Sequence, residues 1–249
     1  MFFPINRDRR PDRTPYVTCA LIFANSLVWS GLTIAGINQK FVLEYGLRPA
    51  HWTLVTLFAS MFLHAGLFHV GGNMWFLWMF APKIEERLGS VFFLAAYLIC
   101  GVGAAGLHSL LNWGASLPLV GASGAISGIV GIYFLLFPRS PFSLVLYLGF
   151  WFRKSFDVMT RGAIGCWIGE QFVLGLITGF GAGAGIAFWA HIGGFLTGLG
   201  IAGIVLVRTE PEERRAILRP AKLTEDERDE IFADRVEQPS KLTTLRLND

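Results

Sequence analysis

Charge is scarce in this sequence. Only 16% of the 249 residues are Asp, Glu, Lys or Arg, whereas soluble domains carry about 25%. The scarcity is local, because both ends of the chain are charged and four long stretches are almost charge-free: residues 17–37, 54–82, 91–137 and 162–207. This pattern is typical of a helical protein that crosses a membrane several times. The net charge of +3 is better explained by loop asymmetry than by nucleic-acid binding, so we expect no nucleic-acid partner.

Several chemical features are also missing. The three cysteines, Cys19, Cys100 and Cys166, all fall in apolar segments and cannot all pair, which excludes a disulfide framework. There is no His-Glu-x-x-His motif of the kind that binds zinc in metalloproteases. No Asp occurs between Asp12 and Asp157, so a pair of intramembrane aspartates is excluded as well.

The apolar segments predict six transmembrane helices, at about residues 17–37, 67–82, 91–111, 122–137, 162–180 and 186–207. The predicted fold class is therefore an all-α membrane protein, a six-transmembrane-helix bundle. We expect three parts: an N-terminal segment at residues 1–16, a helical domain at residues 17–207 and a charged tail at residues 208–249. Within the tail, residues 224–236 fit a surface helix that begins with a capping box.

The segments between these helices differ in character. Residues 38–66 are semi-polar and rich in Trp, Leu and Phe, and we expect part of them in the membrane interface. The apolar middle of the 138–161 loop, residues 142–152, fits the same place. Residues 83–87 are charged and predict an aqueous turn, and residues 181–185 predict a flexible link. Lys and Arg concentrate on one side of the predicted topology, which places both termini in the cytoplasm.

Four polar residues fall at a similar depth in this topology. His69 and Asn73 lie in the first two turns of the second helix and, four apart, share one face. Ser123 opens the short fourth helix within the glycine-rich run Gly121–Gly124, and His191 lies about five residues into the last helix. Polar groups in apolar surroundings are costly unless they are partnered. Their shared depth indicates that they meet around a wet cavity near the external surface.

This set of residues has a chemical interpretation. Serine is a weak nucleophile unless a base takes its proton, and neutral histidine is a suitable base. Ser123 and His191 therefore predict a catalytic dyad, and His69 and Asn73 predict donors that stabilise an oxyanion. Each residue alone has a structural alternative, because a lone membrane Ser often bonds its own backbone and a lone His or Asn often joins helices.

The chain resembles the rhomboid family of intramembrane serine proteases. The resemblance rests on Gly-x-Ser-Gly at Gly121–Gly124, His-x-x-x-Asn at His69–Asn73, Glu-x-Arg-x-Gly at Glu85–Gly89 and the run from Ala190 to Gly194. It implies a six-helix bundle with Ser123 as nucleophile, His191 as base and an oxyanion hole made by His69, Asn73 and the Ser123 backbone. It also implies cleavage of transmembrane or membrane-proximal segments of membrane proteins, with no metal and no cofactor. Close packing of the last helix on the fourth is implied by glycines on both: Gly124, Gly128, Gly193, Gly194 and Gly198.

The sequence departs from the family pattern at two places. Some members carry an aromatic residue four positions after the nucleophile, and here that position is Ser127. Glu170 lies beside Gln171 in the middle of an apolar helix, where an apolar residue is expected. Alternative functions are a non-catalytic rhomboid-like protein that binds transmembrane clients, and a small transporter. The compact form and short N-terminus predict a bacterial plasma membrane, whereas the substrate and the oligomeric state are not predicted.

Overall fold

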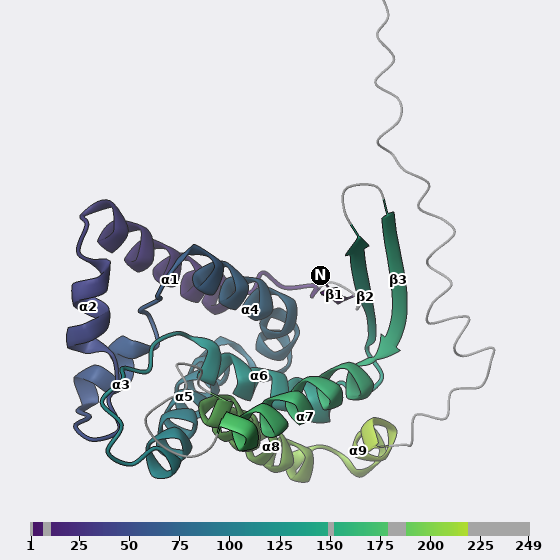
Figure 1. Cartoon of the computed structure of the whole chain (residues 1–249). Coiled ribbons are helices and arrows are strands. Elements are labelled where there is room, and N and C mark those ends of the chain that lie inside the picture. Colours follow the sequence, from purple (N-terminus) through teal and green to yellow (C-terminus); the bar gives the residue numbers. More distant parts are fainter. Residues whose placement is uncertain (1, 7–10, 149–151, 179–187, 219–249) are drawn as a thin grey trace, which may run out of the picture.

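A computed structural model describes residues 2–6, 11–148, 152–178 and 188–218 (Figure 1). These parts of the chain are mostly helical. The helices are α1 Tyr16–Ile34, α2 Asn38–Tyr45, α3 Leu54–Ser60, α4 Leu67–Leu88, α5 Ser90–Leu111, α6 Ser123–Leu136, α7 Thr160–Thr178, α8 Phe188–Arg208 and α9 Pro211–Leu218. The strands are β1 Phe2–Asn6, β2 Pro141–Leu148 and β3 Phe152–Met159. The helical class is thus confirmed for most of the described chain.

Helix α6 lies at the centre of the helical part. It packs against α4, α5, α7 and α8, and nearly all of its residues are buried. It has only 14 residues, which is about 21 Å at 1.5 Å per residue. The hydrocarbon core of a bilayer is about 30 Å thick. A central helix of this length can therefore begin below the membrane surface, as predicted for the fourth helix.

Glycines allow α6 and α8 to approach closely. A Cβ atom at Gly194 would collide with the carbonyl oxygen of Gly124, and one at Gly198 would collide with that of Gly128. The pairs are in register along both chains, so the two helices run parallel. Gly193 instead faces α5, where its Cβ atom would lie 2.7 Å from the Gly103 carbonyl oxygen. The expectation that it packs on α6 was wrong.

Three of the described helices are long and apolar enough to cross a membrane: α1, α5 and α8. α6 is a shorter apolar helix. Large apolar side chains are exposed on all three long helices, for example Phe23, Ile99 and Ile204. Exposed apolar side chains on long helices are suited to contact with lipid rather than water. These features indicate an integral membrane protein.

The second apolar helix is longer than predicted. α4 continues to Leu88 and contains Pro82, so residues 83–87 form its last turns and not an aqueous turn. The reason is a contact between the end of α4 and another helix. The Glu85 carboxylate accepts hydrogen bonds from the Val17 and Thr18 backbone N–H groups and the Thr18 and Ser90 hydroxyls, at 2.7–2.9 Å. Glu85 is thereby buried at the start of α1, and the charge does not require a solvated turn.

The segment between α1 and α4 forms two short helices. α1 ends at Ile34, three residues before the predicted end, and α2 follows from Asn38. Thr53 and Thr56 form a capping box at the start of α3. Trp52, Leu54 and Val55 are exposed, and the position of this segment in the membrane interface stays a prediction.

A three-stranded antiparallel sheet in the order β1-β2-β3 replaces the predicted interfacial loop at residues 142–152. The hairpin of β2 and β3 projects from the helical part in Figure 1. The all-α expectation was therefore incomplete. A short apolar run rich in aromatic residues is ambiguous by itself, and pairing of residues 141–148 with residues 2–6 and 152–159 decides in favour of strands. The predicted link at residues 181–185 and the predicted helix at residues 224–236 lie outside the described residues.

Candidate active site

Ser123 and His191 lie side by side although 68 positions separate them. Ser123 is the first residue of α6 and His191 lies in the first turn of α8, so parallel packing of these helices brings them together. The His191 Nε2 atom is 3.0 Å from the Ser123 Oγ atom, which is hydrogen-bond distance. Both side chains are half-buried. The pair has the geometry of a nucleophile and its general base.

His69 and Asn73 face the loop that leads to Ser123. A Cβ atom at Gly121 would lie 2.7 Å from the His69 Nε2 atom and 3.4 Å from the Asn73 Nδ2 atom. Gly121 also has a φ of 115°, in the region that only glycine adopts readily. Both the space and the backbone therefore require glycine here, because a side chain would press on the His69 and Asn73 nitrogen atoms.

The two side chains are set to donate hydrogen bonds. The Ala65 N–H donates to His69 Nδ1 at 3.4 Å, and a neutral imidazole with an accepting Nδ1 carries its proton on Nε2. Asn73 is buried, and its Nδ2 atom has no partner in the described part of the chain. A buried donor without a partner costs about 1–3 kcal/mol. Among the buried polar atoms without a partner in the described residues, Asn73 Nδ2 lies beside the loop that leads to Ser123.

Backbone contacts hold the loop before Ser123 in place. The Gly121 N–H donates to the carbonyl oxygen of Ser60, the last residue of α3, at 2.8 Å. Leu47 and Leu119 exchange two backbone hydrogen bonds at 3.0 and 2.7 Å. As the first residue of α6, Ser123 has an N–H that no carbonyl within the helix can accept. Three donors, the Ser123 N–H, His69 Nε2 and Asn73 Nδ2, therefore lie along the short segment from Gly121 to Ser123.

Gln171 contacts His191, although the sequence did not predict it as a site residue. The Gln171 Oε1 atom is 2.7 Å from His191 Nδ1, and Gln171 is buried. The Trp167 ring, one turn earlier on α7, lies 6.1 Å from the His191 ring at 34°. The polar pair Glu170-Gln171 in an apolar helix was the available signal, but Glu170, the residue singled out, is exposed.

Ser127 does not compete for His191. Its hydroxyl is buried and donates to the Ser123 carbonyl oxygen at 2.7 Å. This back-bond to the residue four positions earlier is common for serine in membrane helices. Ser127 therefore behaves as a structural serine.

The chain matches the model of the rhomboid domain over residues 51–208, which is more than half of its length. This protein belongs to the rhomboid family. The match contains α4 to α8 and hence all four residues predicted for the site.

Several named rhomboid proteins are similar to this one over part of their length. The presenilin-associated rhomboid-like protein, mitochondrial, of Rattus norvegicus is 28% identical over 142 residues, which are 54% of this chain and 37% of the relative. RHOMBOID-like protein 1 of Arabidopsis thaliana is 29% identical over 62% of this chain and 35% of its own. Rhomboid protein 1, mitochondrial, of Saccharomyces cerevisiae is 30% identical over 43% of this chain and 33% of its own. The chain thus spans about a third of the length of these relatives.

Other histidines of this rhomboid lie near the site without joining the pair. His64 is buried and its ring lies edge-on to that of His69, with 5.1 Å between centroids. Burial and, to a smaller extent, the nearby His69 lower the pKa of His64 to about 4, so His64 is neutral at pH 7. His108 contacts Asn112 on α5. In the described residues, no cluster of three or more His, Cys, Asp or Glu side chains could hold a metal ion.

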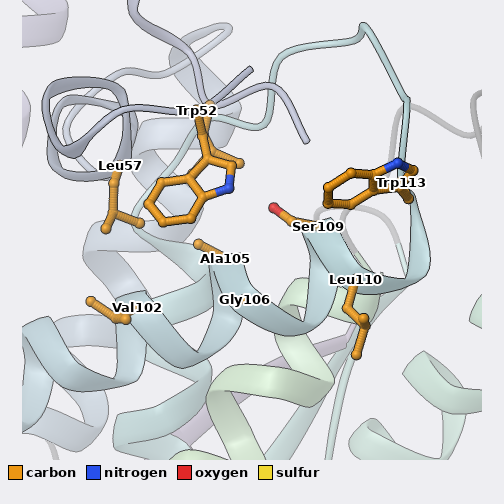
Figure 2. Close-up of a pocket in the computed structure, with 9 residues that line it drawn as sticks. Trp52, Leu57, Val102, Ala105, Gly106, Ser109, Leu110 and Trp113 are labelled. Carbon is orange, nitrogen blue, oxygen red and sulfur yellow. The ribbon is translucent and has the colours of Figure 1, made fainter. Parts of the chain in front are cut away.

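An apolar pocket of about 260 Å³ lies apart from the Ser123–His191 pair. Figure 2 shows Trp52 and Leu57 on one side of it and residues of α5 on the other. Trp113 closes one end. None of the four predicted site residues lines this pocket, so it is not the cavity expected around Ser123.

Proposed function

We propose that this rhomboid is an intramembrane serine endopeptidase that cleaves transmembrane or membrane-proximal segments of membrane proteins. The observation that carries the proposal is the 3.0 Å contact between His191 Nε2 and Ser123 Oγ. The Asn73 Nδ2 donor near Gly121, which has no partner among the described residues, supports the same function. A protein that only binds transmembrane clients has no need of a nucleophile, a base and free donors at one point.

The proposed reaction uses these groups in sequence. The Ser123 oxygen attacks the carbonyl carbon of the scissile peptide bond, and its proton passes to His191 Nε2. The oxyanion accepts hydrogen bonds from the Ser123 N–H, His69 Nε2 and Asn73 Nδ2. His191 then protonates the leaving amine as the carbon–nitrogen bond breaks. Water, which gives its proton to His191, finally hydrolyses the acyl-enzyme and restores the serine hydroxyl.

We further propose that α4, α6 and α7 cross the membrane together with α1, α5 and α8, which makes six spans. The domain division predicted from the sequence, with helices at residues 17–207 between two aqueous ends, belongs to the same proposal. Lys and Arg near the ends of α4 and α8 support a cytoplasmic location for both termini. The partners of the protein are then transmembrane substrates and the lipid bilayer. A bacterial plasma membrane stays a prediction, because the named relatives include mitochondrial and chloroplastic proteins.

The test is cleavage of a panel of tagged transmembrane substrates by the purified protein in liposomes. We expect cleavage by the wild type and by Ser127→Ala, and none by Ser123→Ala or His191→Ala. Cleavage that survives Ser123→Ala would refute the mechanism. Stable binding of the panel without cleavage by the wild type would favour the non-catalytic alternative.

A further inference from the structure

Both ring nitrogens of His191 have defined partners. Nε2 contacts the Ser123 hydroxyl at 3.0 Å and Nδ1 contacts Gln171 Oε1 at 2.7 Å. An amide oxygen can only accept a hydrogen bond, so Nδ1 must be the donor in this contact. A neutral imidazole has a single N–H, which leaves Nε2 without a proton. The Gln171 contact thus selects the tautomer in which Nε2 can accept the serine proton.

The sequence around Ser123 offers no other support for the histidine ring. Ser127 takes the position where some family members have an aromatic residue, and its hydroxyl is bonded to its own helix. On α7, Trp167 and Gln171 are four residues apart and so share one face. One packs near the ring of His191 and the other accepts a hydrogen bond from its edge. Apart from Ser123 itself, the described residues that orient the base therefore come from α7.

We propose that Gln171 is a positioning residue for the base of this enzyme: its Oε1 atom accepts the Nδ1–H of His191 and keeps Nε2 free to take the Ser123 proton, while Trp167 limits rotation of the ring. The inference rests on the proposed protease function and adds a third residue to the dyad. When His191 takes the proton, Nδ1–H remains bonded to Gln171 and the new N–H lies on Nε2, next to the leaving amine.

The neutral amide suits its surroundings. A carboxylate in this place would be a buried charge in a membrane helix, at a high desolvation cost. An amide supplies the acceptor oxygen without that charge. It also stabilises the imidazolium less than a carboxylate would, so its contribution is orientation and choice of tautomer.

Kinetics separate this role from simple packing. Gln171→Leu removes the acceptor oxygen and places an apolar side chain of similar size at the same position. We expect its kcat to fall about 10- to 100-fold with KM little changed, because a misoriented base slows the chemical step. Glu170→Leu, the same replacement at the exposed neighbour, is the matched control and should keep the wild-type kcat. Gln171→Glu, which restores an acceptor oxygen, should recover part of the loss. A wild-type kcat in Gln171→Leu would overturn the proposal.

The tautomer can be measured without any substrate. Nitrogen-15 NMR of the full-length chain labelled at histidine, with His191 assigned by comparison with His191→Asn, should show His191 protonated at Nδ1. In Gln171→Leu the proton should redistribute to Nε2, and in Glu170→Leu it should not. A wild-type His191 protonated mainly at Nε2 would also overturn the proposal. If the wild type cleaves no substrate, the proposed function fails, and the NMR result still decides whether Gln171 sets the tautomer.

Discussion

At the scale of single residues, the site is defined by which polar atoms have partners and which do not. The Ser127 hydroxyl is bonded to backbone, His191 has a partner at each nitrogen, and Asn73 Nδ2 has none in the described chain. A buried polar atom normally finds a partner. Asn73 Nδ2 is one of several buried atoms without a partner in the described residues, and it is the one that faces Gly121 in the loop before Ser123 together with His69. Under the proposed function, a substrate oxygen is expected to bind there.

Replacement of Asn73 by Ala should lower turnover without unfolding the protein. Loss of one oxyanion donor typically costs about 10²–10³ in kcat, and we expect a fall of that order with KM little changed. The measurement is steady-state cleavage in liposomes, with folding checked by circular dichroism. Asn25→Ala is the control, because Asn25 is also buried but bonds the Leu21 carbonyl of its own helix. Unchanged turnover in Asn73→Ala would assign Asn73 to helix packing.

At the scale of elements, single side chains fasten helices to one another. Glu85 on α4 satisfies the first N–H groups of α1, and the negative charge also suits the positive end of that helix. Arg87 bonds Glu213 on α9 at 2.8 Å. The Glu85–Gly89 motif is thus explained by anchoring, on the opposite ends of the helices from Ser123. On the other side, Trp167 and Gln171 make α7 part of the site, since displacement of α7 from α8 removes both contacts with His191.

Replacement of Glu85 by Ala should destabilise the protein by about 0.5–2 kcal/mol, the range for loss of a helix N-cap. The Val17 and Thr18 N–H groups lose their acceptor in a region where Thr18 is fully buried. Reversible unfolding in mixed micelles measures the change. Glu86→Ala is the matched control, because Glu86 accepts only from the exposed Asp12 N–H in the described structure. Equal stability of the two variants would contradict the anchoring role.

At the scale of the whole molecule, α4, α6 and α8 run in the same direction. Their first turns carry His69, Ser123 and His191. The last turns of α4 and α8 carry the charged groups. One end of the helix bundle therefore holds the candidate site, and the opposite end holds the contacts made by Arg and Glu side chains. This polarity is the physical basis for placing the site near the external surface.

The topology predicts different access from the two sides of the membrane. In a variant without native cysteines, Ser116→Cys before α6 should react with an impermeant maleimide in intact cells. Glu212→Cys on α9 and Arg13→Cys before α1 should react only after permeabilisation. All three positions are exposed, so burial does not explain a difference. Labelling of Glu212→Cys in intact cells would reverse the proposed orientation.

The sequence by itself determined the helical membrane class and the approximate places of the apolar helices, and it singled out Ser123, His191, His69 and Asn73 as candidate site residues. Hydrophobic length, glycine spacing and charge are local properties that a single chain displays directly. The depth argument brought Ser123, His69, Asn73 and His191 together because a membrane gives helices a common axis and fixes the height of each residue.

Only the tertiary structure decided the features that depend on rotation and pairing between elements. Whether Gln171 or Glu170 faces His191 depends on the angle of α7 about its axis, which an almost uniformly apolar helix does not reveal. The strand pairing of residues 2–6 with 141–148 joins distant segments, and the end of α4 depends on a contact between Glu85 and α1. In each case a long-range contact outweighs the local preference, because it satisfies backbone or side-chain polar groups that the local segment leaves unpaired.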